Sequence, residues 1–253
     1  MNDDRYDLTV VIACYNEEPL LEESVRQIRS ILDNTRFSYE LIYIDDCSKD
    51  RTVEIAGSLV EDHPNEKLVC HEKNAGRGKT VTEGMNMARG AICGFIDIDL
   101  ETHARYIPSL ALAVQEGADV ATAYRIYKVR LDSVPRWILS KGYVRLVRFL
   151  YGVRLKDTET GCKFFRKDRI LPVLSEVKDN HWFWDTEVMV RAYFAGLDIV
   201  EIPTLFLRRT DKTSSVRIVR DVIYYMKKIL EFRPTARKLR HQYEKTRASD
   251  TRQ

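Results

Sequence analysis

The sequence predicts an α/β fold with a mostly parallel sheet and helices on both of its faces. Over the first hundred residues, short apolar runs rich in β-branched side chains alternate with stretches of helical periodicity. Most residues of these runs are hydrophobic, as is typical of strands buried on both faces of a parallel sheet. Polar and acidic residues follow three of the four runs. Because ligands of such sheets bind at the carboxyl ends of the strands, the first half also predicts where a ligand binds.

The first half contains four predicted strands and three predicted helices in alternation. The strands are expected at residues 8–13, 40–44, 67–70 and 91–96. The helices are expected at residues 19–32, 51–60 and about 80–88, and Gly90 ends the last one. Three strand ends are followed by the clusters Tyr15-Asn16-Glu17, Asp45-Asp46 and Asp97-Ile98-Asp99. Parallel strands end at one edge of the sheet, so these clusters are expected to lie together.

The second half is less regular and predicts a helical C-terminal extension. Further helices are expected at residues 107–116, 135–150 and 184–195, with strands at 119–123 and within 197–207. Residues 216–232 predict a long helix that Pro234 closes, followed by a polar, basic and frayed tail. We therefore expect one domain over residues 1–215 and a C-terminal helix with its basic tail over residues 216–253.

The charge of the 253-residue chain is unevenly distributed. The formal net charge is only +3, but residues 1–124 carry −11, residues 125–156 carry +8 and the remainder carries +6. Charge asymmetry of this kind indicates partners rather than fold. We do not expect nucleic acid among these partners, because the acidic first half would repel a polyanion from the neighbouring cleft.

Other classes of protein are excluded by what the sequence lacks. No apolar run approaches the roughly 18 to 20 residues that span a bilayer, and the first residues show no secretory pattern. The five cysteines are scattered and never form C-x-x-C, which argues against a disulfide framework or a cysteine zinc site. A reducing cytoplasm is therefore the expected compartment.

The segment Gly76-Arg77-Gly78-Lys79-Thr80 resembles the end of a phosphate-binding P-loop. The full pattern requires glycine at position 73, where this chain has lysine. A P-loop would also leave the acidic ends of the first two strands without a role. We therefore reject a P-loop nucleotide hydrolase.

Asp97, Asp99 and Glu101 form the strongest candidate metal site. In an extended segment alternate side chains point to the same side, so these three carboxylates are expected to converge. Carboxylate oxygens are preferred ligands of Mg²⁺ and Mn²⁺, which share their coordination shell with a diphosphate. The alternative is an acidic surface loop with solvated charges, and the neighbouring acidic strand ends favour the metal site.

Four segments, residues 11–18, 44–52, 74–79 and 97–99, resemble family 2 glycosyltransferases in order and spacing. The resemblance implies a GT-A-type fold, that is, a Rossmann-like and mostly parallel mixed sheet. It also implies an inverting mechanism and a metal-bound nucleotide diphosphate-sugar donor, in which the sugar is linked to GDP or UDP. The implied metal ligands are Asp99 and Glu101. Ala13 and Cys47 stand where the family usually has Pro and Gly. The implied donor-binding residues are Ala13, Tyr15, Glu17, Tyr43, Asp45, Asp97, Ile98, Asp99 and Arg209.

The second half resembles the polyprenyl-phosphate branch of that family, which includes dolichyl-phosphate mannose and glucose synthases. The resemblance rests on Tyr124-Arg125, on Arg136 with Ser140, and on residues 157–166. It implies that Arg125, Arg136 and Ser140 bind the acceptor phosphate, and that Asp99, Arg125 and Arg136 are the catalytic residues. Glu159 and Cys162 stand where the branch usually has Gln or Thr and Phe.

Residues 135–150 predict a basic amphipathic helix with Lys141, Arg145 and Arg148 on one face. Together with Trp137, this composition is typical of a helix at a membrane interface. We therefore expect an anionic membrane surface as a partner, with peripheral attachment at the inner face and a membrane-anchoring protein as a further candidate partner. A surface helix with a solvated charged face is the alternative. Residues 133–137 match only part of the Q-x-x-R-W pattern of processive polysaccharide synthases. We therefore reject processive synthesis as the function.

The leading hypothesis is a metal-dependent inverting glycosyltransferase that moves a hexose to a polyprenyl phosphate at the cytoplasmic membrane face. A phosphate monoester is largely dianionic at neutral pH and needs positioning rather than a general base. A second hypothesis keeps the donor but uses a soluble or glycan hydroxyl, with Asp185 as the base. A third is a noncatalytic adaptor that binds nucleotide-sugars or membranes.

Overall fold

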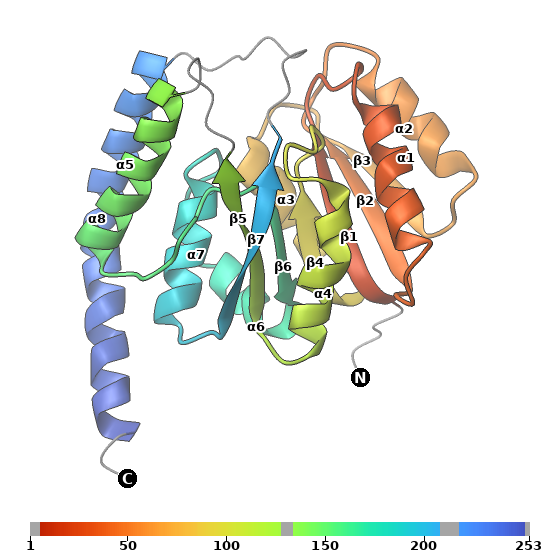
Figure 1. The fold of residues 1–253 in the computed structure, drawn as a ribbon. Helices are drawn as coiled ribbons and strands as arrows, with labels where there is room; N and C mark the ends of the chain where they lie inside the picture. Colours follow the sequence, from red (N-terminus) through yellow and green to blue (C-terminus); the bar gives the residue numbers. More distant parts are fainter. Residues whose placement is uncertain (1–5, 128–133, 208–217, 251–253) are drawn as a thin grey trace.

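The computed structural model describes the backbone of residues 6–127, 134–207 and 218–250 (Figure 1). Side chains are described over the same ranges except at residues 134–138, 218–221 and 250. Within these ranges the chain forms one sheet with helices packed on both faces. This confirms the predicted fold class.

The sheet has seven strands in the described part of the chain, in the order β3-β2-β1-β4-β6-β5-β7. Neighbouring strands are parallel except where β6 pairs with β4 and with β5. The sheet is therefore mixed and mostly parallel, as expected. The strands are β1 Tyr6–Cys14, β2 Tyr39–Asp45, β3 Glu66–Cys70, β4 Gly90–Ile96, β5 Val120–Tyr127, β6 Cys162–Arg166 and β7 Ile199–Phe206.

Two hydrophobic cores lie on opposite faces of this sheet. On β1, Val11 joins one core while Val10 and Ile12 join the other, because successive side chains of a strand alternate between faces. Helices α1, α2 and α4 cover one core, and α3 with α5 to α8 cover the other. The helices are α1 Leu21–Leu32, α2 Thr52–Glu61, α3 Arg77–Asn86, α4 Ile107–Gln115, α5 Val134–Tyr151, α6 Lys167–Leu174, α7 Trp184–Phe194 and α8 Ile218–Asp250, with a 3-10 turn at Ala104–Tyr106.

Helix α8 corrects the predicted frayed tail. It passes through Pro234 and continues to Asp250. Ala236 is fully buried beyond the proline, and the ring of Tyr243 lies 6.1 Å from that of Tyr193 and 6.0 Å from that of Phe194. Packing of this kind offsets the hydrogen bond that proline removes. Among the described residues, no helix is long and apolar enough to cross a membrane.

Strand β6 and helix α6 were not predicted, and the start of β6 lies at the edge where the parallel strands end. β6 lies between β4 and β5 and runs antiparallel to both. Its first residue, Cys162, pairs with Ile96 at the end of β4. The segment before β6 therefore lies against the residues that follow β4, at the same edge where Cys14 pairs with Asp45.

Candidate active site

The carboxylates after β4 lie on a tight turn rather than on an extended segment. The N–H of Leu100 donates to the carbonyl oxygen of Asp97 at 3.1 Å, and Leu100 has a φ of 50°. The predicted alternation of three carboxylates along an extended segment is therefore wrong. Asp99 instead accepts a hydrogen bond at Oδ1 from the N–H of Glu101 at 3.1 Å. Ile98 is buried in the core, so its side chain has no surface on which to bind a donor.

Arg77, at the start of α3, links Asp97 to Asp185 of α7. Its Nε and Nη2 donate to Oδ1 of Asp97 at 2.9 and 2.6 Å, and its Nη1 donates to Oδ2 of Asp185 at 2.7 Å. Lys163 of β6 donates to the other oxygen of Asp185 at 2.6 Å and is completely buried. These four residues, Asp97, Arg77, Asp185 and Lys163, form a charge chain that joins three elements, and it is largely buried except at Asp97, whose side chain is 37% exposed.

Asp185 is therefore held by two cations rather than available as a base. Both of its oxygens accept hydrogen bonds from charged groups, and its side chain is 5% exposed. Protonation of this carboxylate would break one of these charge-assisted bonds. The geometry disfavours the alternative in which Asp185 deprotonates a hydroxyl acceptor.

Asp97 carries an electrostatic cost that a bound cation would relieve. Burial raises its pKa, the Arg77 guanidinium opposes that shift, and the nearby charges of Asp99 and Asp185 add to it. A divalent cation beside the Asp97–Asp99 turn would favour the ionised form of both carboxylates.

Because of this turn, the protein offers few carboxylates to any one metal ion. In the described ranges, no three His, Cys, Asp or Glu side chains converge closely enough to hold a metal. Mg²⁺ commonly uses only one or two protein carboxylates and takes its other ligands from substrate phosphates and water. Asp97, Asp99 and Glu101 therefore fit a metal that is shared with a diphosphate better than a metal held by the protein alone.

Asp45 ends β2 with one buried oxygen that accepts no hydrogen bond from any described residue. The side chain is 1% exposed, its Oδ2 accepts from the N–H of Ser48 at 2.9 Å, and its Oδ1 has no partner. Buried polar atoms are normally hydrogen-bonded, and an orphan acceptor at a site edge suits a ligand donor. Tyr15, at the end of β1, leaves 49% of its side chain exposed near this edge. Ala13 and Glu17 flank it and are partly buried.

Tyr43 was expected to bind the donor, and the structure corrects this. Its side chain is completely buried in the core, and its hydroxyl donates to Oε2 of Glu66 at 2.6 Å. Arg29 pairs with the same carboxylate at 2.7 Å. The side chain therefore points away from the site edge, and its role is to anchor β2 to β3 and α1.

Asp46, to which the sequence assigned no separate role, holds the glycine-rich loop. Its two oxygens accept from the N–H groups of Ala75 at 2.6 Å and Gly76 at 2.9 Å. His71 bridges Asp46 at 2.8 Å and Glu83 at 2.6 Å. Burial opposes protonation of His71, but these two carboxylates raise its pKa. The loop thereby places Arg77 at the start of α3.

Arg125 and Ser140, two of the predicted acceptor ligands, meet around Tyr127 at the end of β5. Arg125 forms a two-pronged pair with Asp157 at 2.7 and 2.9 Å and lies over the ring of Tyr127 at 5.7 Å. The hydroxyl of Tyr127 lies 3.3 Å from Oγ of Ser140, and Nζ of Lys141 lies 5.9 Å from the same ring. The side chain of Arg136, and the whole of Arg209, lie outside the described residues.

Three functional candidates were missed from sequence: Arg77, Lys163 and Asp157. Lys163 had a usable signal, because a lysine inside the apolar strand Cys162–Arg166 is buried only when it has an acidic partner. Its partner lies 22 positions away, and the partner of Arg77 on α7 lies 108 positions away. Spacing in the sequence does not reveal such pairs.

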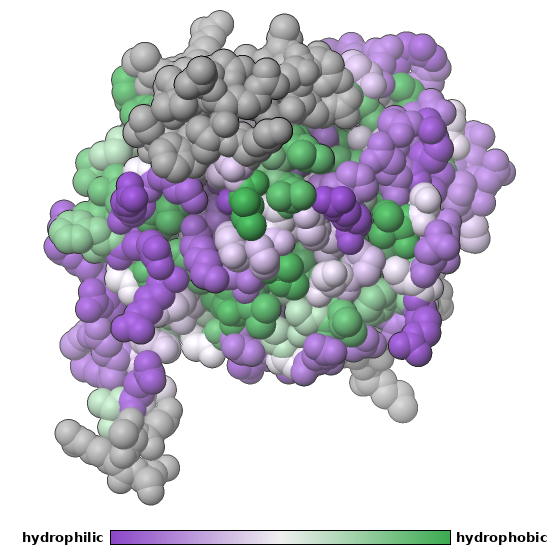
Figure 2. Space-filling view, in the orientation of Figure 1, coloured by the Kyte–Doolittle hydropathy of each residue, from purple (hydrophilic) through white to green (hydrophobic). Residues whose placement is uncertain are grey.

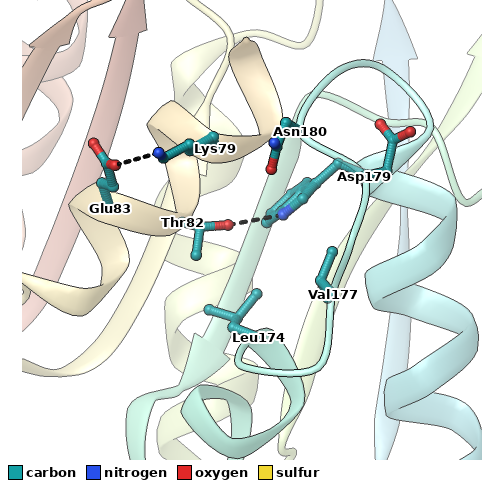
Figure 3. A pocket seen from close by; sticks show the side chains of 8 residues that line it. Lys79, Thr82, Glu83, Leu174, Val177, Asp179 and Asn180 are labelled. Atoms are coloured by element: carbon teal, nitrogen blue, oxygen red, sulfur yellow. Dashed lines mark hydrogen bonds and ion pairs between the residues drawn. The ribbon is translucent and has the colours of Figure 1, made fainter. Parts of the chain in front are cut away.

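A pocket of about 240 Å³ lies beside this site, between α3 and the segment before α7 (Figure 3). Two pairs of its polar groups bind each other: Nε1 of Trp184 donates to Oγ1 of Thr82 at 2.8 Å, and Lys79 lies 3.6 Å from Glu83. Trp184 also packs edge-on against Phe95, whose ring lies under Arg77. The pocket therefore belongs to the framework behind Arg77. Its lining residues are Lys79, Thr82, Glu83, Leu174, Val177, Asp179, Asn180 and Trp184.

Comparison with known proteins identifies relatives that share most of this chain. "Glycosyltransferase AglD" of Haloferax volcanii is 32% identical over 222 residues, which cover 86% of this chain and 35% of that protein. "Dolichyl-phosphate beta-glucosyltransferase ALG5C" of Trichomonas vaginalis is 28% identical, with 77% and 62% covered. "Dolichol-phosphate mannosyltransferase" of Pyrococcus furiosus is 30% identical, with 79% and 56% covered. The chain therefore spans less than two thirds of the length of each of these relatives, and only about a third of the first.

Solved structures of glucosyl-3-phosphoglycerate synthase from Mycobacterium tuberculosis share the fold. The complex with Mn²⁺, UDP-glucose and phosphoglyceric acid has a TM-score of 0.65 at 20% identity, covering 91% of this chain and 79% of that one. The complex with phosphoglyceric acid has a TM-score of 0.67 at 18% identity, covering 91% and 80%. This likeness confirms the expected GT-A-type α/β fold. The sequence profile described as "Glycosyl transferase family 2" matches residues 9–171, well over half of the sequence, and the chain therefore belongs to glycosyltransferase family 2.

Proposed function

We propose that this protein is a metal-dependent inverting glycosyltransferase that moves a hexose from a nucleotide diphosphate-sugar to a polyprenyl phosphate at the cytoplasmic membrane face. Relatives named as dolichyl-phosphate or dolichol-phosphate glycosyltransferases support the acceptor class. The match to glycosyltransferase family 2 supports the reaction class.

The donor nucleotide is proposed to bind across the ends of β1 and β2. The orphan Oδ1 of Asp45 is an acceptor for an N–H group of the base, and either uracil or guanine supplies such a donor. The half-exposed ring of Tyr15 provides a flat surface beside it.

The diphosphate is proposed to lie against the Asp97–Leu100 turn, with Mg²⁺ or Mn²⁺ held by Asp99 and Glu101 and by phosphate oxygens. A metal here would neutralise the charge of the leaving diphosphate. Structures with a related fold were solved in complex with UDP and Mn²⁺ or Mg²⁺, which supports a divalent cation. The role of Arg77 is to hold Asp97 in place, and Arg209 is proposed as a further cation for the diphosphate.

The acceptor phosphate is proposed to bind at Arg125, Arg136 and Ser140. Asp157 fixes the plane of the Arg125 guanidinium, and 15% of the Arg125 side chain stays exposed. The observation that carries this choice is the Asp185 carboxylate, which is held by two cations and so is poorly suited to deprotonate a hydroxyl. A phosphate dianion is itself the nucleophile and needs only to be aimed at the anomeric carbon.

The membrane is proposed to bind the side of the molecule formed by α5 and α8, which pack together (Figure 1). Figure 2 shows hydrophobic and hydrophilic residues next to one another on this side. Phe149 of α5 is 84% exposed, and Ile223 and Leu230 of α8 are 63% and 55% exposed. Exposed Arg145 and Arg148 lie on α5 within four residues of Phe149. Apolar side chains flanked by cations suit an anionic bilayer surface.

Vesicle flotation tests this surface. Phe149→Ser with Ile223→Ser should lower binding to vesicles that contain phosphatidylglycerol, while Leu112→Ser on α4, also a change at an exposed leucine, should not. Equal binding by all three proteins would reject the surface. Binding only to vesicles that carry extracted membrane proteins would favour a membrane-anchoring partner instead.

The activity itself is tested with UDP- and GDP-linked sugars, Mn²⁺ and farnesyl phosphate, a short polyprenyl phosphate, with products read by mass spectrometry. Asp99→Ala should abolish transfer, and Arg136→Ala should chiefly raise the KM for farnesyl phosphate. Full activity of Asp99→Ala in the presence of a chelator would reject the metal role. Transfer to hydroxyl acceptors alone would favour the second hypothesis. If the protein neither transfers the sugar nor hydrolyses the donor, the adaptor hypothesis is favoured.

A further inference from the structure

Glu159 places a second carboxylate on the guanidinium of Arg125. Oε2 of Glu159 lies 3.8 Å from Nη2 of Arg125, while Asp157 already binds that guanidinium at 2.7 and 2.9 Å. The N–H of Glu159 also donates to Oδ1 of Asp157 at 3.0 Å, which fixes the segment. Arg125 is thus neutralised once by Asp157, and an ionised Glu159 would leave this cluster with a net negative charge.

The other groups that face Glu159 do not compensate this charge. Arg125 is the cation that acts on it most strongly, and a hydrogen bond with Tyr225 also favours its ionised form. Burial of Glu159 disfavours its ionised form, Arg125 opposes that effect, and the charges of Asp157 and Asp185 add to it. The facing groups are Arg125 and Tyr127 of β5, Tyr143 of α5, Asp157 of its own segment, Asp185 of α7 and Tyr225 of α8.

We propose that Glu159 is a positioning residue that controls, by binding and releasing one proton, whether Arg125 can hold the acceptor phosphate. This inference rests on the proposed function, because it takes a phosphate as the acceptor. With Glu159 protonated, a phosphate dianion meets a neutral Arg125–Asp157 pair and a carboxyl O–H that can donate to it. With Glu159 ionised, the same dianion meets a surplus negative charge and is repelled.

The control operates near neutral pH. Burial raises the pKa of Glu159 to about 7, whereas the phosphate acquires its second charge near pH 6. Acceptor binding is therefore expected to be strongest between these two values and to weaken above them. At higher pH, binding of the phosphate requires Glu159 to take up a proton from solution.

Calorimetric titration with farnesyl phosphate at pH 6.5, 7.5 and 8.5 tests this. If only the protonated form binds, affinity of the unmodified protein should fall roughly ten- to thirtyfold between pH 6.5 and 8.5. Glu159→Gln keeps the shape without the charge and should bind with nearly constant affinity over this range. Glu116→Gln, at an exposed glutamate after α4, is the matched control and should follow the unmodified protein.

Proton uptake gives a second readout that a merely structural role would not move. At pH 8, titrations in buffers of different ionisation enthalpy should report close to one proton taken up per farnesyl phosphate bound by the unmodified protein, and none by Glu159→Gln. Glu159→Thr should behave like Glu159→Gln, which keeps the test valid if one variant folds poorly.

The outcomes separate this inference from the proposed function. If farnesyl phosphate binds and the pH dependence is the same with and without Glu159, the inference is overturned and the acceptor class stands. If farnesyl phosphate binds to none of the proteins at any pH, the acceptor class fails and the inference fails with it.

Discussion

Replacing Asp185 by asparagine should destabilise the fold by breaking the charge chain. Asp185 is 4% exposed and accepts from Arg77 at 2.7 Å and from Lys163 at 2.6 Å. Asparagine keeps the volume but removes the charge, and its amide cannot accept from both cations. Lys163, which is completely buried, is left with the carbonyl oxygen of Thr160 as its remaining described acceptor.

The size of this effect follows from the burial. Removing one partner of a buried ion pair typically costs about 3–5 kcal/mol, because the other charge stays buried without compensation. For a chain of this length each kcal/mol lowers Tm by about 2–4 °C, so Asp185→Asn should lower Tm by roughly 6–20 °C. The free energy of unfolding, measured in urea at pH 7, is the primary readout.

A double-mutant cycle separates the pair from the individual residues. Lys163→Met removes the buried cation, and the Lys163→Met, Asp185→Asn double variant should lose less stability than the two single losses together. The coupling free energy is expected to lie at about 1–3 kcal/mol. A loss below about 1 kcal/mol in Asp185→Asn, or strictly additive losses, would refute the charge chain. Abolished transfer at unchanged stability would instead identify Asp185 as a base.

Three further outcomes are expected. Asp45→Asn should weaken binding of UDP- or GDP-linked sugars about 5- to 150-fold in calorimetry, because the orphan Oδ1 loses its charge toward a donor. Gly161→Ala should abolish Mn²⁺-dependent donor binding while circular dichroism stays unchanged, because the added methyl would collide with the carboxylate of Asp97. Because the pKa of His71 is raised from 6.5, its stabilisation is complete below pH 6.5 and is lost as the pH rises through the raised value. His71→Asn should therefore cost more unfolding free energy at pH 6 than at pH 9.

The regular half of the fold was predictable because its signals are local. Each of β1 to β4 is a short, mostly apolar run, and the strands begin and end within about one or two residues of the expected positions. β6 was missed because it is inserted between β4 and β5 by pairing over long sequence distances, which leaves no local pattern. Helix α8 was ended too early, because tertiary packing of Ala236 and Tyr243 overrides the helix-breaking tendency of Pro234.

The candidate site was predictable to the extent that topology brings strand ends together. Asp45 and Asp97 do lie at one edge, but Tyr43 lies two residues before the end of β2, where its ring is buried in the core and its hydroxyl binds Glu66 at the start of β3. The arrangement of Asp97 and Asp99 depends on a turn with a positive φ at Leu100, a conformation that a non-glycine residue seldom adopts. Sequence patterns give little warning of such a turn.

The charge chain links the proposed donor and acceptor regions, so a change at one is expected to affect the other. Arg77 binds Asp97 beside the proposed donor site and also binds Asp185 on α7. Asp185 in turn binds Lys163 of β6, the strand that follows the segment of residues 157–161. That segment holds Arg125 through Asp157 and places Glu159 within reach of the charge of Asp185. A change of charge at one end should therefore shift the ionisation of groups at the other. If a bound donor and metal draw Asp97 away from Arg77, Arg77 will bind Asp185 more strongly. Asp185 will then disfavour ionisation of Glu159 less, which makes donor binding and acceptor binding thermodynamically linked.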